Sequence, residues 1–135
     1  MLSVSRHFPR RFLLAVLLVL YALVIVAVVV MADTNRGVAV WSIIGSIPAG
    51  DKVGHFLLFG TLAYLVNALI GKYGGSRAFH IKATVVVAVI VMIEEISQIY
   101  LPHRNFDLVD LFADMAGILS FSLFAYFQKR SSLAA

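Results

Sequence analysis

Four long apolar stretches run through this chain, and their length is the feature that most restricts its fold. They cover residues 12–32, 53–70, 83–100 and 108–127. A helix needs about 20 apolar residues to cross roughly 30 Å of hydrocarbon. A chain of 135 residues with 61% hydrophobic and 13% charged residues has more apolar surface than a soluble core of this size can bury. We therefore predict an all-α polytopic membrane protein, a four-helix transmembrane bundle.

The basic residues give this predicted bundle an orientation. Eight of the 11 Lys and Arg residues precede the first stretch, connect the second to the third, or follow the fourth. Because short loops rich in Lys and Arg stay in the cytoplasm, we predict that both termini are cytoplasmic. The chain then divides into a basic cytoplasmic N-terminus (1–11), a transmembrane domain (12–127) and a cytoplasmic C-terminal tail (128–135).

Two segments allow a second interpretation. Arg10 and Arg11 followed by an apolar stretch resemble a cleaved secretory signal, but about 20 apolar residues exceed the 7 to 15 of a typical signal. This length favours an uncleaved first span. The segment 33–50 is expected to be a tether, with a short stretch in the outer membrane interface around Trp41 as the alternative.

The acidic residues are the strongest indication of a functional site. All seven map to the predicted outer loops or to the outer halves of the spans, and Glu94 and Glu95 lie inside an apolar run. A carboxylate in hydrocarbon costs several kcal/mol unless it is paired, protonated or in contact with water, so such residues are candidates for function. The chain has no cysteine, which excludes disulfides, thiolate nucleophiles and Cys-ligated metals.

Helical spacing groups the polar residues of each predicted span on one face. At 100° per residue, the members of each group lie within one wedge of the helix surface. The helix rise places Glu95 roughly 10 Å below the outer boundary and the other groups at a similar level. The three groups are Asp51, Lys52 and His55; Glu94, Glu95 and Gln98; and Asp107, Asp110 and Asp114. Ala113 and Gly117 form a small-xxx-small pair that allows close approach of another helix.

The charges of this cluster do not balance. Six carboxylates face Lys52 and Arg104, and like charges in a low dielectric cannot all stay ionised. Protonation of carboxylates, protonation of histidine, a divalent cation or a cationic ligand can each compensate, and spacing does not choose among them. The cofactor and the metal content are therefore left open, with a divalent cation as one candidate.

The order of these motifs is similar to that of a known family. Asp51-Lys52-x-x-His55, Glu95-x-x-Gln98 and Pro102-x-Arg104, followed by Asp107, Asp110 and Gly117, resemble the successive motifs of the VanZ-like membrane proteins over residues 51–119. The resemblance implies a small multi-span protein of the bacterial inner membrane. The namesake of the family is associated with resistance to the glycopeptide teicoplanin. Asp114 stands where the family more often has Asn, and His103 where a small residue commonly precedes the arginine.

The preferred hypothesis is an outward-facing site that binds or processes a lipid-linked cell-envelope precursor, and whether it is an enzyme stays open. The catalytic candidates are His55, Glu95 and Asp110, and the candidate substrate-binding residues are Asp51, Lys52, Gln98, Arg104, Asp107 and Asp114. A non-catalytic envelope protein and a small proton-coupled transporter are the alternatives. Membrane lipids are expected partners and nucleic acid is not. His7 and His80 are expected to be no more than interfacial histidines.

Overall fold

The computed structural model describes residues 10–34, 36 and 38–134, and within them the chain is helical with no strand. Five α-helices follow one another: α1 (Arg10–Asp33), α2 (Val38–Ser46), α3 (Gly50–Lys72), α4 (Arg77–Ser97) and α5 (Leu108–Ala134). A short 3₁₀ turn, η1 (Gln98–Tyr100), extends α4. The all-α prediction is confirmed, and the four long helices contain or overlap the four predicted spans.

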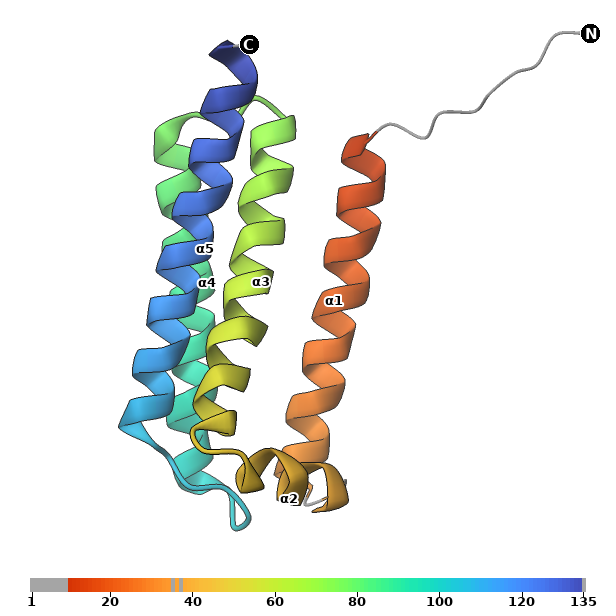
Figure 1. The fold of residues 1–135 in the computed structure, drawn as a ribbon, viewed down its shortest axis with the longest axis vertical. Coiled ribbons are helices and arrows are strands. Elements are labelled where there is room, and N and C mark those ends of the chain that lie inside the picture. Colours follow the sequence, from red (N-terminus) through yellow and green to blue (C-terminus); the bar gives the residue numbers. More distant parts are fainter. Residues whose placement is uncertain (1–9, 35, 37, 135) are drawn as a thin grey trace, which may run out of the picture.

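The long helices run alternately up and down beside one another (Figure 1). α3 packs most extensively against α5, while α4 contacts both of them and α1 packs mainly against α3. The predicted antiparallel contact between the third and fourth spans is confirmed by the packing of α4 against α5. The short α2 crosses beneath α1 and α3 at the end where α3 and α5 begin (Figure 1).

Glycines permit the close contact between α3 and α5. A Cβ atom on Gly117 of α5 would overlap the backbone carbonyl of Phe56 on α3, and one on Gly60 of α3 would meet the Phe121 ring at 2.9 Å and the Gly117 carbonyl oxygen at 3.2 Å. Each glycine therefore faces the other helix without a side chain between them. The expected close approach at Gly117 is confirmed, and its partner helix is α3.

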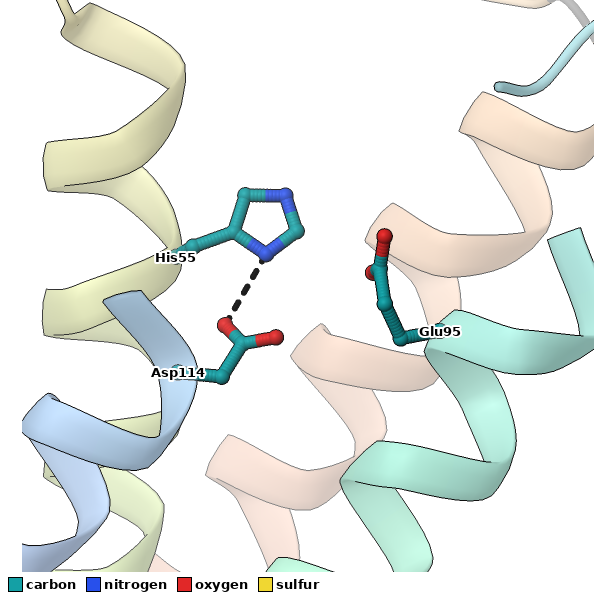
Figure 2. Close-up of side chains that lie close together, drawn as sticks. All are labelled: His55, Glu95 and Asp114. Atoms are coloured by element: carbon teal, nitrogen blue, oxygen red, sulfur yellow. Dashed lines mark hydrogen bonds and ion pairs between the residues drawn. The ribbon is translucent and has the colours of Figure 1, made fainter. Parts of the chain in front are cut away.

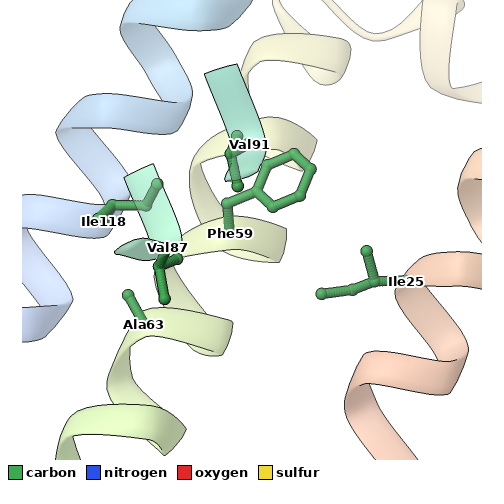
Figure 3. Close-up of a cluster of buried hydrophobic side chains, with 6 residues drawn as sticks. All are labelled: Ile25, Phe59, Ala63, Val87, Val91 and Ile118. Carbon is green, nitrogen blue, oxygen red and sulfur yellow. The ribbon is translucent and has the colours of Figure 1, made fainter. Parts of the chain in front are cut away.

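A small apolar core lies between the helices. Phe59 and Ala63 of α3 meet Val91 of α4 and Ile118 of α5, with Ile25 of α1 closing one side (Figure 3). Most other apolar side chains are exposed, and Ile25 is the one buried residue of α1. A helix that is apolar all round yet exposed suits a lipid environment, where no apolar face needs to be hidden from water.

Three of the helices, α1, α3 and α5, are long and apolar enough to cross a membrane. α4 has 21 residues, but its ends carry Arg77 and Lys82 on one side and Glu94 and Glu95 on the other. These charges lower the mean hydropathy of α4, although its length is sufficient for a span. The structure therefore supports a membrane protein with three candidate spans, and α4 does not qualify on composition.

Turn chemistry sets the end of α3 and the start of α4. α3 ends where Gly74 adopts a left-handed conformation with φ of 74°, and the Gly75 amide returns to the Ile70 carbonyl at 3.0 Å. The Ser76 hydroxyl then accepts from the Phe79 amide and caps α4. At the other end of α4, Pro102 follows η1, after which the chain returns directly into α5.

The segment around Trp41 forms helix α2 rather than a plain tether, so the tether expectation is wrong.

Candidate functional site

The first turns of α3 and α5 and the last turn of α4 lie at the same end of the bundle (Figure 1). The polar faces predicted from helical spacing therefore meet. Contacts link α3 to α5 through Lys52 and His55, and α4 to the start of α5 through Glu95. Convergence of the three groups is confirmed, while the catalytic and binding roles stay predictions.

His55, Glu95 and Asp114 form the buried centre of this site (Figure 2). His55 Nδ1 lies 2.9 Å from Asp114 Oδ1, and the Glu95 carboxyl group faces the imidazole ring from α4. Glu95 and Asp114 each have 0% exposure. Asp114 Oδ2 is buried and makes no hydrogen bond to any residue that the structure describes. Each residue offers one donor atom within 4.8 Å of the other two, so the three side chains could hold a metal ion.

Neighbouring groups hold Glu95 in place. Gln98 Nε2 donates to Glu95 Oε2 at 2.7 Å, and the Asp107 amide approaches Glu95 Oε1 at 3.4 Å. Gln98 Nε2 also lies 3.3 Å from Glu94 Oε1. The prediction that Gln98 sits between the two glutamates and reaches either is confirmed.

Lys52 is the centre of an ion-pair network above this group. Its Nζ lies 2.7 Å from Asp51, 2.8 Å from Asp107 and 2.9 Å from Asp110. The hydrogen bond from Lys52, helped by the Val109 amide, holds the pKa of Asp107 below its ordinary value. Three carboxylates thus surround one ammonium group. Lys52 is therefore a weak binding partner for an anionic ligand.

Arg104 is held much more loosely. Its Nε lies 3.8 Å from Asp33 Oδ1 and one terminal nitrogen lies 4.0 Å from Glu94 Oε1. Arg104 Nε and Asp33 Oδ1 are both buried, and neither has a hydrogen-bond partner in the described part of the chain. Asp33 thereby joins the cluster as its seventh acid, which helical spacing did not reveal because it lies at the end of another helix.

A pocket of about 890 Å³ opens beside the cluster, between α1, α2, α3 and the end of α4. Its polar wall carries Lys52, His55, Glu94, Gln98, Arg104 and Asp110. Its apolar wall includes Val29 of α1, Trp41 and Ile44 of α2, and Leu58 and Phe59 of α3. The exposed His103 also lines it. The pocket is therefore suited to a ligand with one polar end and one apolar end.

The structure also places residues that helical spacing did not connect. His80, expected to be only interfacial, is 4% exposed and bonds to the buried Asn67 at the opposite end of the bundle, so that expectation is wrong. Asn67 was not singled out, although an amide inside an apolar run is a signal of internal hydrogen bonding. His7 lies outside the described residues.

Comparison of the chain with models of protein families, with curated proteins and with solved structures finds no match. The VanZ-like resemblance therefore stays a prediction based on the motifs alone.

Proposed function

We propose that this chain is a VanZ-like protein of the bacterial inner membrane with four spans, both termini in the cytoplasm, and an outward-facing site that binds a lipid-linked cell-envelope substrate through a divalent cation. The alternating directions of the long helices support four spans (Figure 1). Lys72, Arg77, Lys82 and Lys129 lie at the end opposite the acids, as expected of a cytoplasmic face. We expect α4 to be the fourth span although it carries two acids, because Glu94 and Glu95 face the polar cluster and the pocket.

The proposal of a bound cation rests on the group formed by His55, Glu95 and Asp114. Two ligands at about 2.1 Å from one ion lie at most about 4.2 Å apart, so small side-chain rotations bring these donors together. The unpartnered Asp114 Oδ2 provides a second reason, because a buried carboxylate oxygen without a partner is costly. One imidazole nitrogen and two carboxylate oxygens suit Zn²⁺ or Mn²⁺.

The charge balance explains why a phosphate needs this cation. Seven acids lie at this end of the bundle with Lys52 and Arg104 as the only strong bases among the contacts described above. A bare phosphate would be repelled by this excess. A bound divalent cation removes part of the repulsion and offers the phosphate an open coordination position. Arg104, whose Nε has no hydrogen-bond partner among the residues described, supplies a second contact at the pocket wall.

The apolar wall of the pocket supports a lipid as the rest of the substrate. Trp41, Ile44, Leu58 and Phe59 line the same pocket as the polar residues. When the phosphate binds at the polar wall, the first part of the attached hydrocarbon chain contacts these apolar residues.

Binding of a polyprenyl diphosphate tests this proposal. Trp41 is the only tryptophan of the chain and lines the pocket, so its fluorescence reports binding to protein in nanodiscs. We expect saturable binding with Mn²⁺ that is weakened at least tenfold by chelation or by Arg104→Gln. Arg36→Gln is the matched control, because Arg36 does not line the pocket. Binding that is unaffected by both chelation and Arg104→Gln would refute the proposal.

Sidedness and phenotype are tested separately. Because the chain has no cysteine, single cysteines at Gly45 and Gly74 can be labelled without background. We expect a membrane-impermeant thiol reagent to reach Gly45→Cys but not Gly74→Cys in intact cells, and the reverse result would contradict the orientation.

By resemblance, expression is expected to raise tolerance to teicoplanin, and Glu95→Gln to abolish the effect.

A further inference from the structure

A second polar site lies at the other end of the bundle, inside the apolar interface of α3, α4 and α5. Asn67, with 0% exposure, is its centre. Its side-chain nitrogen lies 3.0 Å from the Ala63 carbonyl, 3.2 Å from Thr84 Oγ1 and 3.1 Å from Ser122 Oγ. Its side-chain oxygen lies 2.9 Å from His80 Nδ1.

These contacts fix the tautomer of His80. The Ala63 carbonyl can only accept, so the Asn67 group facing it must be the NH₂ group. The oxygen of the amide then faces His80 and accepts, which requires the proton to be on His80 Nδ1. In the neutral ring, Nε2 consequently carries a lone pair and is a hydrogen-bond acceptor.

This acceptor is buried and has no partner within the described residues. The His80 ring is 4% exposed and Tyr126 packs edge-on against it at 5.4 Å between centroids. Leaving a buried acceptor without a donor is costly, so a donor from outside the chain would be bound favourably.

A cavity of about 320 Å³ lies next to His80 between α4 and α5. Its walls are largely apolar and include Val85 of α4 with Leu119 and Leu123 of α5. The polar residues that line it are Arg77, His80, Asn67, Thr84, Ser122 and Tyr126. Apolar walls are poor partners for a cluster of waters, which each need two to four polar contacts. The cavity instead suits an apolar chain that ends in a polar group.

Charge decides the nature of that polar group. Arg77 lines the cavity, and Lys129 lies close enough to bond the Gly75 carbonyl at 2.6 Å and to act electrostatically on His80. All seven acids of the chain lie at the opposite end, so this end favours an anion.

We propose that this cavity binds an anionic phospholipid with a hydroxyl-bearing headgroup, a headgroup hydroxyl donating to His80 Nε2 and the phosphate contacting Arg77. The acyl chain lies along Val85, Leu119 and Leu123. The site is independent of the acidic cluster, since it shares no residue with the cluster or with its pocket.

Native mass spectrometry of protein from mixed nanodiscs tests this proposal, with phosphatidylglycerol and phosphatidylcholine in equal amounts. We expect one retained phosphatidylglycerol in preference to phosphatidylcholine. Arg77→Gln should lower this preference about fivefold, the effect of one basic residue near an anionic lipid. Lys72→Gln, at the same end but outside the cavity, is the matched control. Equal retention of both lipids, or equal effects of the two substitutions, would overturn the proposal.

A second measurement remains valid if lipids bind elsewhere. The ¹⁵N NMR signal of His80 Nε2, assigned by its loss in His80→Phe, distinguishes a free lone pair from a hydrogen-bonded one. We expect a free Nε2 in phosphatidylcholine and a hydrogen-bonded one in phosphatidylglycerol. Leu119→Trp, which fills the cavity from a position that makes no bond in the Asn67 network, should abolish the difference. A hydrogen-bonded Nε2 in both lipids would identify water as the partner and overturn the proposal.

Discussion

Replacement of Gly117 by alanine should destabilise the bundle, because the new methyl group has no space. Its Cβ would lie 3.0 Å from the carbonyl carbon and 3.1 Å from the Cα of Phe56, and would overlap the carbonyl oxygen of that residue. These are backbone atoms that cannot rotate aside, so α3 and α5 must separate. Overpacking of this kind costs about 1–3 kcal/mol.

Gly54→Ala is the matched control for this substitution. A Cβ on Gly54 would have no heavy atom within 4 Å, and Gly54 lies in α3 close to the same site. Both substitutions gain up to about 1 kcal/mol of helix propensity, so the difference between them isolates the contact with Phe56.

Unfolding of the purified protein by titration of mild detergent with SDS, followed by far-UV circular dichroism, measures this difference. We expect Gly117→Ala to be about 1–3 kcal/mol less stable than Gly54→Ala. Gly117 lies one turn from Asp114, so the same variant should also weaken cation binding at the site. Equal stability of the two variants would refute the packing described for α3 and α5.

Three further predictions concern single residues. Lys52→Met leaves three carboxylates without their shared cation and should cost about 1 kcal/mol in the same titration, with a smaller loss at high salt. Because the pKa of Asp107 is lowered in the folded state, its stabilisation is complete above about pH 4 and is lost as the pH falls through that lowered pKa. Asp107→Asn should therefore flatten the acid limb of the stability curve, measured from pH 2 to 6. Trp41 fluorescence should be quenched more by lipids brominated near the headgroup than by lipids brominated near the chain end, if α2 lies in the membrane interface.

Helical periodicity predicted the acidic site well because its residues repeat along each helix. His55 follows Lys52 by three positions and Asp114 follows Asp110 by four, so each pair shares a face whatever the partner helix is. Packing detail could not be predicted, since the difference between the engaged Lys52 and the loosely held Arg104 depends on side-chain positions.

The Asn67 network could not be predicted from periodicity. Asn67, His80 and Ser122 are single polar residues on three different helices, with no repeated spacing along any one of them. Their contact depends on the register of α3 against α4 and α5, which Gly60 and Gly117 help to set. The sequence signal was an amide inside an apolar run, and that signal does not identify a partner.

The most direct test of the proposed site is the number of divalent cations that the protein binds. Electron paramagnetic resonance of Mn²⁺ titrated into the purified protein counts bound ions. We predict one bound Mn²⁺ per chain, lost in Glu95→Gln and Asp114→Asn but retained in Asp51→Asn, since Asp51 is exposed and outside the donor group. No bound ion in the wild type, or equal binding by all four proteins, would contradict the account.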